Sequence, residues 1–252
     1  INDASTRFAL VFHSQDVDPV GPVRSGRYPD IQILEAFNRP LFVWSGGNGG
    51  VTYYIDRSQM VSLSATKTSG YYRRSGRKSP QNLYTSTDVM WGKAPEDAEI
   101  PPVVFQYFRE GDTLPTDDAS AATAIEVTLD SVKVRWEYDA EKGQYFRFHG
   151  DRPHNTENSG QVWTDNLIVM KANYLQSPID AKTPDAQMLG TNPVYIFSGG
   201  TVREGVWLRF ASTDRYAFYT DSTFTTELRI PPGRTFVEIP RNIDGNLDYG
   251  VE

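Results

Sequence analysis

The chain has 252 residues and a formal net charge of −7, with 38% hydrophobic and 13% aromatic residues. This length and apolar content are sufficient for one large domain or two halves in contact, and they exclude global disorder. The acidic balance argues against sequence-independent nucleic-acid binding, because phosphate backbones repel a protein of this sign.

The sequence contains no cysteine. This excludes disulfide bonds, thiolate nucleophiles and zinc–thiolate sites. No run of about 18 apolar residues is present, so no membrane-spanning helix is predicted. The chain begins at Ile1 without an initiator methionine or a signal-like apolar stretch, and we expect it to be a processed or trimmed fragment of a longer precursor.

Residues 1–112 are predicted to form an α/β half. Strands are expected at Thr6–His13, Leu41–Ser45 and Val103–Phe108. A helix is expected over Pro29–Phe37, where apolar residues recur on one helical face and proline stands in the first turn. A second helix is expected from Pro80 to Trp91, with Ser79 as its N-cap.

Residues 113–124 are small and acidic and are predicted to form a linker. Residues 125–240 are predicted to be mostly β, because apolar and polar residues alternate in several short runs. Strands are expected at Ile125–Leu129, Val132–Tyr138, Gln144–Phe148, Asn166–Lys171, Val194–Phe197, Val202–Phe210 and Thr235–Ile239, with a hairpin turn at Glu141–Gly143. Residues 241–252 are expected to be a frayed acidic tail. The predicted fold class is α+β, a layered sheet-and-helix sandwich that is rich in β-structure and has few helices, mainly in the N-terminal half.

One tetrapeptide occurs twice, as Arg24-Ser25-Gly26-Arg27 and as Arg74-Ser75-Gly76-Arg77, each time before a predicted helix. Cations at this position face the positive end of the helix dipole, which is unfavourable for them. A bound anion would reverse this penalty, because it would meet free N–H groups and guanidinium groups together.

The repeat therefore predicts a ligand site for a phosphate, carboxylate or sulfate, formed by Arg24, Arg27, Arg74 and Arg77, with Asn82 beside them and the Ser45–Gly50 turn as one wall. The competing interpretation is that these arginines pair with carboxylates of the protein itself, such as Asp16, Asp18 or Glu110, because structural ion pairs are common. Ser45–Gly50 lacks the Gly-Lys-Ser/Thr ending of a nucleotide-binding loop, and Val43 stands where a G-x-S-x-G motif needs its first glycine.

His149, Asp151 and His154 lie within one short segment. Their spacing matches no standard zinc signature, and Gly150–Pro153 has the composition of a turn, so we predict no bound metal and no cofactor. Asp151 and His154 remain candidates for contact with a ligand. In a catalytic protein they would be the candidates for a general acid or base.

Several stretches match one family in the same order along the chain. They are Thr6–Phe8, Gly21–Arg27, Tyr72–Arg74, Asn82–Thr85, Trp136–Asp139, Tyr145–Arg147, Gly150–His154, Asn166–Val169, Gly205–Trp207 and Pro232–Thr235. In this order they resemble the YerB-like envelope lipoprotein family over about residues 5–240. The resemblance implies a bacterial exported protein with a layered sheet-and-helix fold, attached to the membrane through a lipid on an N-terminal cysteine.

This chain has neither that cysteine nor the additional N-terminal segment, which includes a strand, that family members carry. Membrane attachment is therefore implied only through relatives, and the trimmed chain is expected to expose an unpaired edge beside Thr6–His13. The resemblance implies no activity. We favour a noncatalytic, extracytoplasmic module that binds an anionic or carbohydrate component of the cell wall or a protein partner. The alternatives are a hydrolase or transferase acting on envelope polymers and a structural subunit of a surface assembly.

Overall fold

The computed structural model describes residues 7–109, 111–112, 119–179, 183–241 and 243–251. Within these ranges the chain has three α-helices, one 3-10 helix and eighteen strands, so the predicted β-rich character is confirmed. All the described helices precede Gly92, as expected. None of them is both long enough and apolar enough to cross a membrane.

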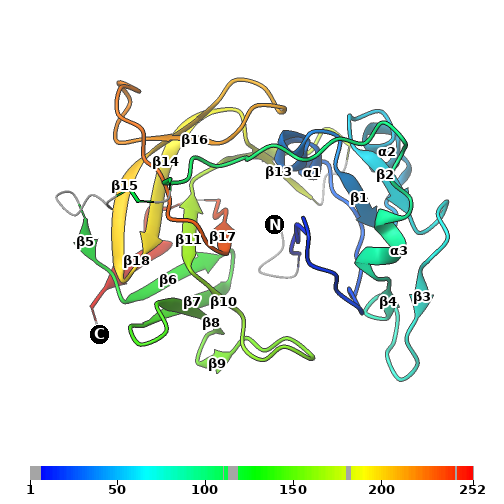
Figure 1. Cartoon of the computed structure of the whole chain (residues 1–252), viewed down its shortest axis with the longest axis horizontal. Helices are drawn as coiled ribbons and strands as arrows, with labels where there is room; N and C mark the ends of the chain where they lie inside the picture. The colour runs from blue at the N-terminus through cyan, green and yellow to red at the C-terminus, as the bar shows by residue number, and fades with distance from the viewer. Residues whose placement is uncertain (1–6, 110, 113–118, 180–182, 242, 252) are drawn as a thin grey trace.

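The N-terminal part holds the helices and four short strands (Figure 1). In chain order these are α1 Pro29–Leu34, the 3-10 helix η1 Glu35–Phe37, β1 Leu41–Trp44, α2 Gly49–Ile55, β2 Val61–Ser64, β3 Tyr72–Arg73, β4 Leu83–Tyr84 and α3 Thr87–Trp91. Strands β1 and β2 are parallel and are connected through α2, whereas β3 and β4 form an antiparallel hairpin. A small core of Leu34, Trp44, Val51, Ile55 and Met60 holds this part together.

The C-terminal part consists of two six-stranded sheets and one hairpin. The first sheet has the order β10-β8-β7-β6-β18, with β9 beside β8; the second has the order β16-β15-β14-β11-β17, with β5 beside β15. The strands are β5 Ser120–Ala121, β6 Ala124–Leu129, β7 Val132–Asp139, β8 Gln144–His149, β9 Arg152–Pro153, β10 Trp163–Thr164, β11 Asn166–Met170, β12 Asn173–Gln176, β13 Pro184–Gln187, β14 Gly190–Ser198, β15 Thr201–Arg209, β16 Ala217–Tyr219, β17 Thr235–Glu238 and β18 Leu247–Gly250. Strands β12 and β13 form the separate hairpin.

Alternation along the strands builds two hydrophobic clusters. Val134 and Trp136 of β7 pack in one cluster with Leu167 and Val169 of β11, so this cluster lies between the two sheets. The intervening β11 residues Ile168 and Met170 belong to a second cluster on the opposite face. Every residue of β11 is buried for this reason.

Helix α1 and η1 connect the two parts of the molecule. Leu34 packs in the N-terminal core, whereas Ala36 packs in the cluster on the outer face of the second sheet. The side-chain oxygen of Gln32 accepts a hydrogen bond from Met188 N at 2.9 Å. The backbone carbonyl oxygen of Gln32 accepts one from Arg209 Nη1 at 2.9 Å. The residues before β1 therefore belong to both cores, and the two predicted halves do not have separate interiors.

Several predicted elements are wrong. Residues 7–13 are not a strand, so the predicted unpaired edge is absent there; Phe8 instead lies against Phe236 and His154 of the C-terminal part. The predicted helix from Pro80 to Trp91 contains β4 and only the five-residue helix α3, which Ser86 caps. Residues 103–108 make only an isolated bridge, between Tyr107 and Ile230.

The predicted linker and the predicted frayed tail both contain strands of the sheets. The predicted linker falls partly outside the described residues, but its described end contains β5, paired with β15, and the fully buried Ala122. The predicted frayed tail contains β18, which pairs with β6 and forms an edge of the first sheet. Short strands of mixed polarity such as these obtain their order from neighbouring strands, which local composition does not reveal.

Candidate functional site

The first Arg-Ser-Gly-Arg loop packs against β1 and leads into α1, as predicted. Arg24 O accepts a hydrogen bond from Ser45 N at 2.9 Å, and Gly26 N donates one to Gly46 O at 3.2 Å. A side chain at Gly26 would begin 2.7 Å from the Trp44 ring, so glycine is needed for this close approach. The first loop therefore lies beside the Ser45–Gly50 turn.

The side chain of Asp30 accepts a hydrogen bond from a backbone N–H group just before α1. Its Oδ2 accepts a hydrogen bond from Arg27 N at 2.7 Å. Burial raises the pKa of Asp30 to about 6, although this hydrogen bond and the nearby Arg27 charge oppose the shift. The positive end of this short helix thus already has a carboxylate of the protein beside it.

The second Arg-Ser-Gly-Arg loop precedes no helix. It forms the tip of the β3–β4 hairpin, and Gly76 there has a φ of +79°, which favours glycine. Arg74 Nη1 lies 2.9 Å and Arg77 Nη2 2.8 Å from the two carboxylate oxygens of Glu157. These two arginines therefore pair with an acid of the protein, as the competing interpretation expected of the loops, although Glu157 was not among the acids considered.

Asn82 belongs to the same hairpin. Its Oδ1 accepts a hydrogen bond from Arg73 Nη1 at 2.7 Å, and its Nδ2 donates one to Arg77 O at 3.3 Å. Asn82 therefore orients the guanidinium group of Arg73 and closes the loop. Arg73 was not among the predicted site residues.

The hairpin lies in a strongly basic segment of an acidic protein. From Arg57 to Thr87 the sequence has six Lys or Arg residues and no Asp or Glu. The exposed face of the hairpin therefore presents uncompensated positive charge, apart from the contact with Glu157. This charge pattern is visible in the sequence and would have identified the hairpin without reference to helices.

A cleft of about 400 Å³ separates this hairpin from Val23, Ser45 and the residues that follow β2. Its lining includes Val23, Ser45, Thr66, Tyr72, Arg73 and Ser79. Thus Val23, which precedes the first loop, Ser45 of the turn after β1 and the β3–β4 hairpin meet at one cleft, but no residue of either Arg-Ser-Gly-Arg loop is in its lining, and the basic residue there is Arg73 of β3. None of the ten residues that line the cleft is acidic or a histidine.

Tyrosines form an aromatic wall of the cleft. Tyr72 is 46% exposed and stacks on the buried Tyr84, with ring centroids 6.1 Å apart. The hydroxyl of Tyr71 donates to Leu63 O, and burial raises the pKa of Tyr71 to about 12. Tyr71 is thus fixed in place, whereas Tyr72 leaves part of its aromatic surface exposed in the lining that it shares with Arg73.

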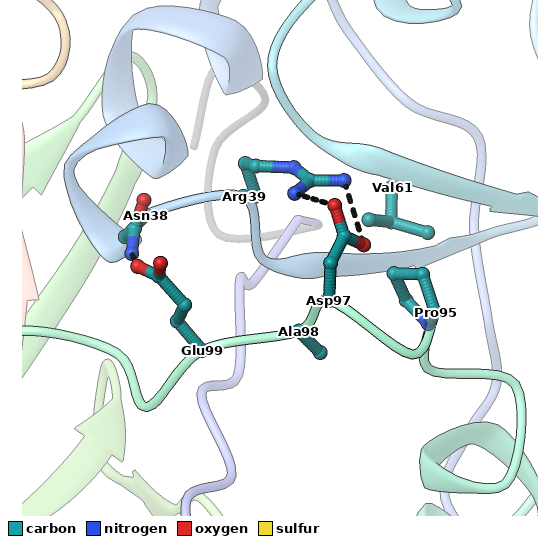
Figure 2. A pocket seen from close by; sticks show the side chains of 7 residues that line it. All are labelled: Asn38, Arg39, Val61, Pro95, Asp97, Ala98 and Glu99. Atoms are coloured by element: carbon teal, nitrogen blue, oxygen red, sulfur yellow. Dashed lines mark hydrogen bonds and ion pairs between the residues drawn. The ribbon is translucent and has the colours of Figure 1, made fainter.

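A second, smaller cavity of about 110 Å³ lies where residues 95–99 cross the end of η1 (Figure 2). Arg39 Nη1 donates to Asp97 Oδ2 at 2.8 Å, and Asn38 Nδ2 donates to Glu99 Oε2 at 2.8 Å. Arg39, Asp97 and Glu99 are therefore each bonded to another residue of the cavity lining. The cavity marks where the chain leaves the N-terminal part, and its side chains join two segments.

His154 belongs to a buried cluster centred on Arg147 of β8. Arg147 Nη1 lies 2.6 Å from His149 Nε2 and 2.7 Å from His154 Nδ1, and Arg147 Nε donates to Glu238 Oε1 at 3.2 Å. A guanidinium group has donors only, so both imidazole nitrogens accept and both rings are neutral. The imidazole rings stack with centroids 4.4 Å apart.

Burial and the Arg147 charge lower the pKa of both histidines, that of His154 to about 4. Burial raises the pKa of Glu238, and the pairing with Arg147 opposes this shift. The rings of Phe8, Trp136 and Phe236 lie 5.3–5.7 Å from the guanidinium carbon. His154 is therefore an acceptor in a closed polar cluster.

Asp151 is exposed in the turn between β8 and β9, away from the cleft lining. Among the described residues, no three His, Cys, Asp or Glu side chains are grouped as ligands of a metal ion would be. Sequence reasoning did not identify Arg147, although Tyr145 and Arg147 share one face of β8 and Tyr145 is buried. A charged residue at an inward position of a predicted strand is the signal that would have found it.

Comparison with known proteins finds two models of one family that match successive parts of the chain. Residues 1–99 match the model "Protein of unknown function (DUF3048) N-terminal domain", and residues 124–237 match the C-terminal domain of the same family. The chain belongs to the YerB-like family. A curated relative, the Bacillus subtilis protein named "Putative lipoprotein YerB", is 24% identical over 250 residues, which cover 95% of this chain and 72% of the relative.

The crystal structure of the YerB protein from Bacillus subtilis has the same fold. Its TM-score is 0.76 with 21% sequence identity, and the match covers 95% of this chain and 80% of that chain. The YerB-like resemblance expected from the ordered stretches is thus confirmed. The family descriptions state that its function is unknown.

Proposed function

We propose that this chain is an extracytoplasmic envelope protein that binds an anionic cell-wall polymer in the cleft beside the β3–β4 hairpin and does not modify it chemically. The location rests on the relative's name, since a lipoprotein is held at a membrane by its lipid. The layered sheet-and-helix architecture expected of the family would serve here as a rigid support for the hairpin.

The observation that carries the proposal is the combination of Tyr72 and Arg73 in one open cleft. A half-exposed tyrosine ring offers an apolar face to a sugar ring, and a guanidinium group offers paired donors to a phosphate or carboxylate. The hydroxyls of Ser45, Thr66 and Ser79 line the same space and suit sugar hydroxyl groups. The acid-free segment around the hairpin adds long-range attraction for polyanions.

The noncatalytic part of the proposal rests on the chemistry of the lining. General acid–base catalysis most often uses an imidazole or a carboxylate within hydrogen-bonding reach of the reacting atoms, and the ten residues that line the cleft include neither. His154 is not assigned such a role, because its Nδ1 faces Arg147 and its lowered pKa makes it a weak base. Binding requires only donors and a stacking surface, and the cleft has both.

The test is calorimetric titration of the protein with three probes: poly(glycerol phosphate), oligogalacturonate and chitotetraose. We expect uptake of one of the two anionic polymers that weakens with salt. Arg73→Gln removes a charge-assisted contact and should weaken that binding at least about tenfold. Tyr72→Ala should weaken it about three- to tenfold.

The matched control is Tyr53→Ala. Tyr53 is 51% exposed on α2, lies under the guanidinium of Arg57 and does not line the cleft. The Tyr53→Ala substitution removes the same aromatic surface from another basic site, so the affinity for the anionic polymer should be unchanged. Absence of uptake of any probe, or equal losses in the Tyr53 and Tyr72 variants, would overturn the proposal.

A further inference from the structure

We infer that Arg74 and Arg77 form a second anion subsite of the cleft and that Glu157 occupies this subsite as an internal substitute for the ligand. The inference rests on the proposed function, because it assigns a further contact and a means of regulation to the same site. Its chemical content is one carboxylate or phosphate group held by two guanidinium groups. A ligand that fills both the cleft and the subsite must carry repeated acidic groups.

The geometry of the contact resembles ligand binding. Arg74 and Arg77 each donate to a different oxygen of one carboxylate, at 2.9 and 2.8 Å. Two donors on one anion is the arrangement by which arginines hold phosphates and carboxylates. Arg73, which lines the cleft, directly precedes Arg74, and Asn82 joins the hairpin by accepting from Arg73 Nη1 and donating to Arg77 O, so the subsite and one wall of the cleft belong to the same hairpin.

The carboxylate comes from a different part of the molecule. Glu157 lies at the tip of a turn between β9 and β10 that is closed by the bridge of Asn155 with Gln161 and by a hydrogen bond from Thr156 N to Gly160 O at 2.8 Å. In Figure 1 the chain after β9 extends from the C-terminal sheets toward the side of β3 and β4. Because the turn makes its own hydrogen bonds, it keeps its shape whether or not Glu157 touches the hairpin.

The contact is easy to displace. The side chains of Arg74, Arg77 and Glu157 are 38–40% exposed, so solvent screens both ion pairs. Exposed pairs of this kind contribute little, and the cations of an acid-free hairpin keep their attraction for other anions. Glu157 therefore competes with a ligand at a modest level, which lowers affinity and rejects ligands that carry a single weak charge.

The test compares Glu157→Gln with the wild type for binding of poly(glycerol phosphate) and oligogalacturonate, the two probes that separate phosphate from carboxylate ligands. Removing the internal competitor should raise affinity about two- to thirtyfold, the range that two exposed ion pairs allow. The combined variant Glu157→Gln, Arg74→Gln, Arg77→Gln should lose this gain. The Glu157→Gln substitution should raise the affinity for monomeric inorganic phosphate less than the affinity for the polymer, because a single phosphate reaches only one subsite.

Glu141→Gln is the matched control, since Glu141 is exposed in the β7–β8 turn and its replacement changes net charge equally. It should leave affinity within about twofold of the wild type. If the wild type binds and Glu157→Gln binds no more tightly than Glu141→Gln, the subsite inference is overturned and the cleft proposal stands. If neither protein binds either polymer, the cleft proposal fails and the inference fails with it.

Discussion

Arginines in two regions of this molecule meet glutamates under opposite conditions. Arg147 and Glu238 form their pair between the sheets, with side chains 0% and 6% exposed, whereas Arg74 and Arg77 meet Glu157 at a surface where all three are 38–40% exposed. In the first region both charges have lost their water, so neither can part from the other without a large penalty. In the second region water replaces a lost partner at little cost.

The surroundings reinforce this difference. Three aromatic rings and two neutral imidazoles surround Arg147, and the two imidazoles accept hydrogen bonds from its guanidinium group. The hairpin arginines pair with Glu157 at the surface, where the Arg74 guanidinium also lies over the Tyr84 ring, and Arg73 beside them lines an open cleft. The buried arginine is therefore held in place between the two sheets, whereas the exposed arginines can exchange Glu157 for water at little cost.

The largest expected effect is that of breaking the buried pair. Arg147→Met leaves Glu238 buried without a cation and should lower the free energy of unfolding by about 3–5 kcal/mol. Equilibrium denaturation in urea measures this loss. The double variant Arg147→Met, Glu238→Leu removes both charges and should recover most of the stability. An equal loss in the single and double variants would show that packing at Arg147, and not the unpaired carboxylate, is responsible.

The two histidines beside Arg147 predict an intermediate effect that depends on pH. The pKa of His154 is lowered to about 4 from an ordinary value of 6.5, so the unfolded chain takes up protons first as the pH falls. The stability that the folded protein gains from a neutral His154 is fully present above pH 6.5 and is lost as the pH falls from 6.5 to about 4. We expect a loss of about 1–2 kcal/mol, allowing for the partial exposure of the ring.

The control for this pH dependence replaces each ring by an amide of matching reach. In His149→Gln the Oε1 atom takes the place of Nε2, and in His154→Asn the Oδ1 atom takes the place of Nδ1, so Arg147 keeps two acceptors that do not titrate. Denaturation of the double variant at pH 7, 6, 5 and 4 should show a shallower decline than the wild type. Parallel declines in the two proteins would assign the acid sensitivity to other groups.

Much of the C-terminal fold was predictable because its strands are short runs rich in β-forming residues, and several of them alternate apolar and polar residues. Strands β6, β7, β8, β11, β15 and β17 lie close to their expected ranges, since inward apolar residues such as Val134 and Trp136 fix both register and facing. Elements that lack this pattern were missed. Helix α2 begins with two glycines, and its start is set by Asn48, whose Oδ1 accepts from Val51 N at 2.8 Å.

The candidate site was predictable only in part, because a repeated tetrapeptide was taken to mean a repeated structure. Gly26 serves a close approach to Trp44, whereas Gly76 serves a left-handed turn, so the same four residues form two different loops. The partner Glu157 is 80 residues from Arg77, and local sequence holds no signal for such a pairing. The positive charge of the hairpin and its acid-free flanks were the stronger signal, because they do not depend on secondary structure.

The smallest expected effect is that of breaking the exposed pairs, and it decides whether the comparison holds. Arg74→Gln combined with Arg77→Gln, and separately Glu157→Gln, should each lower the free energy of unfolding by less than about 1 kcal/mol. A double-mutant cycle over these two variants and the protein that combines them measures the coupling between hairpin and turn. That coupling should vanish in 1 M salt, where screening acts over about 3 Å. A coupling above about 2 kcal/mol that persists in salt would place these arginines with Arg147, as groups that stabilise the fold, and would leave Glu157 too firmly held for a ligand to displace.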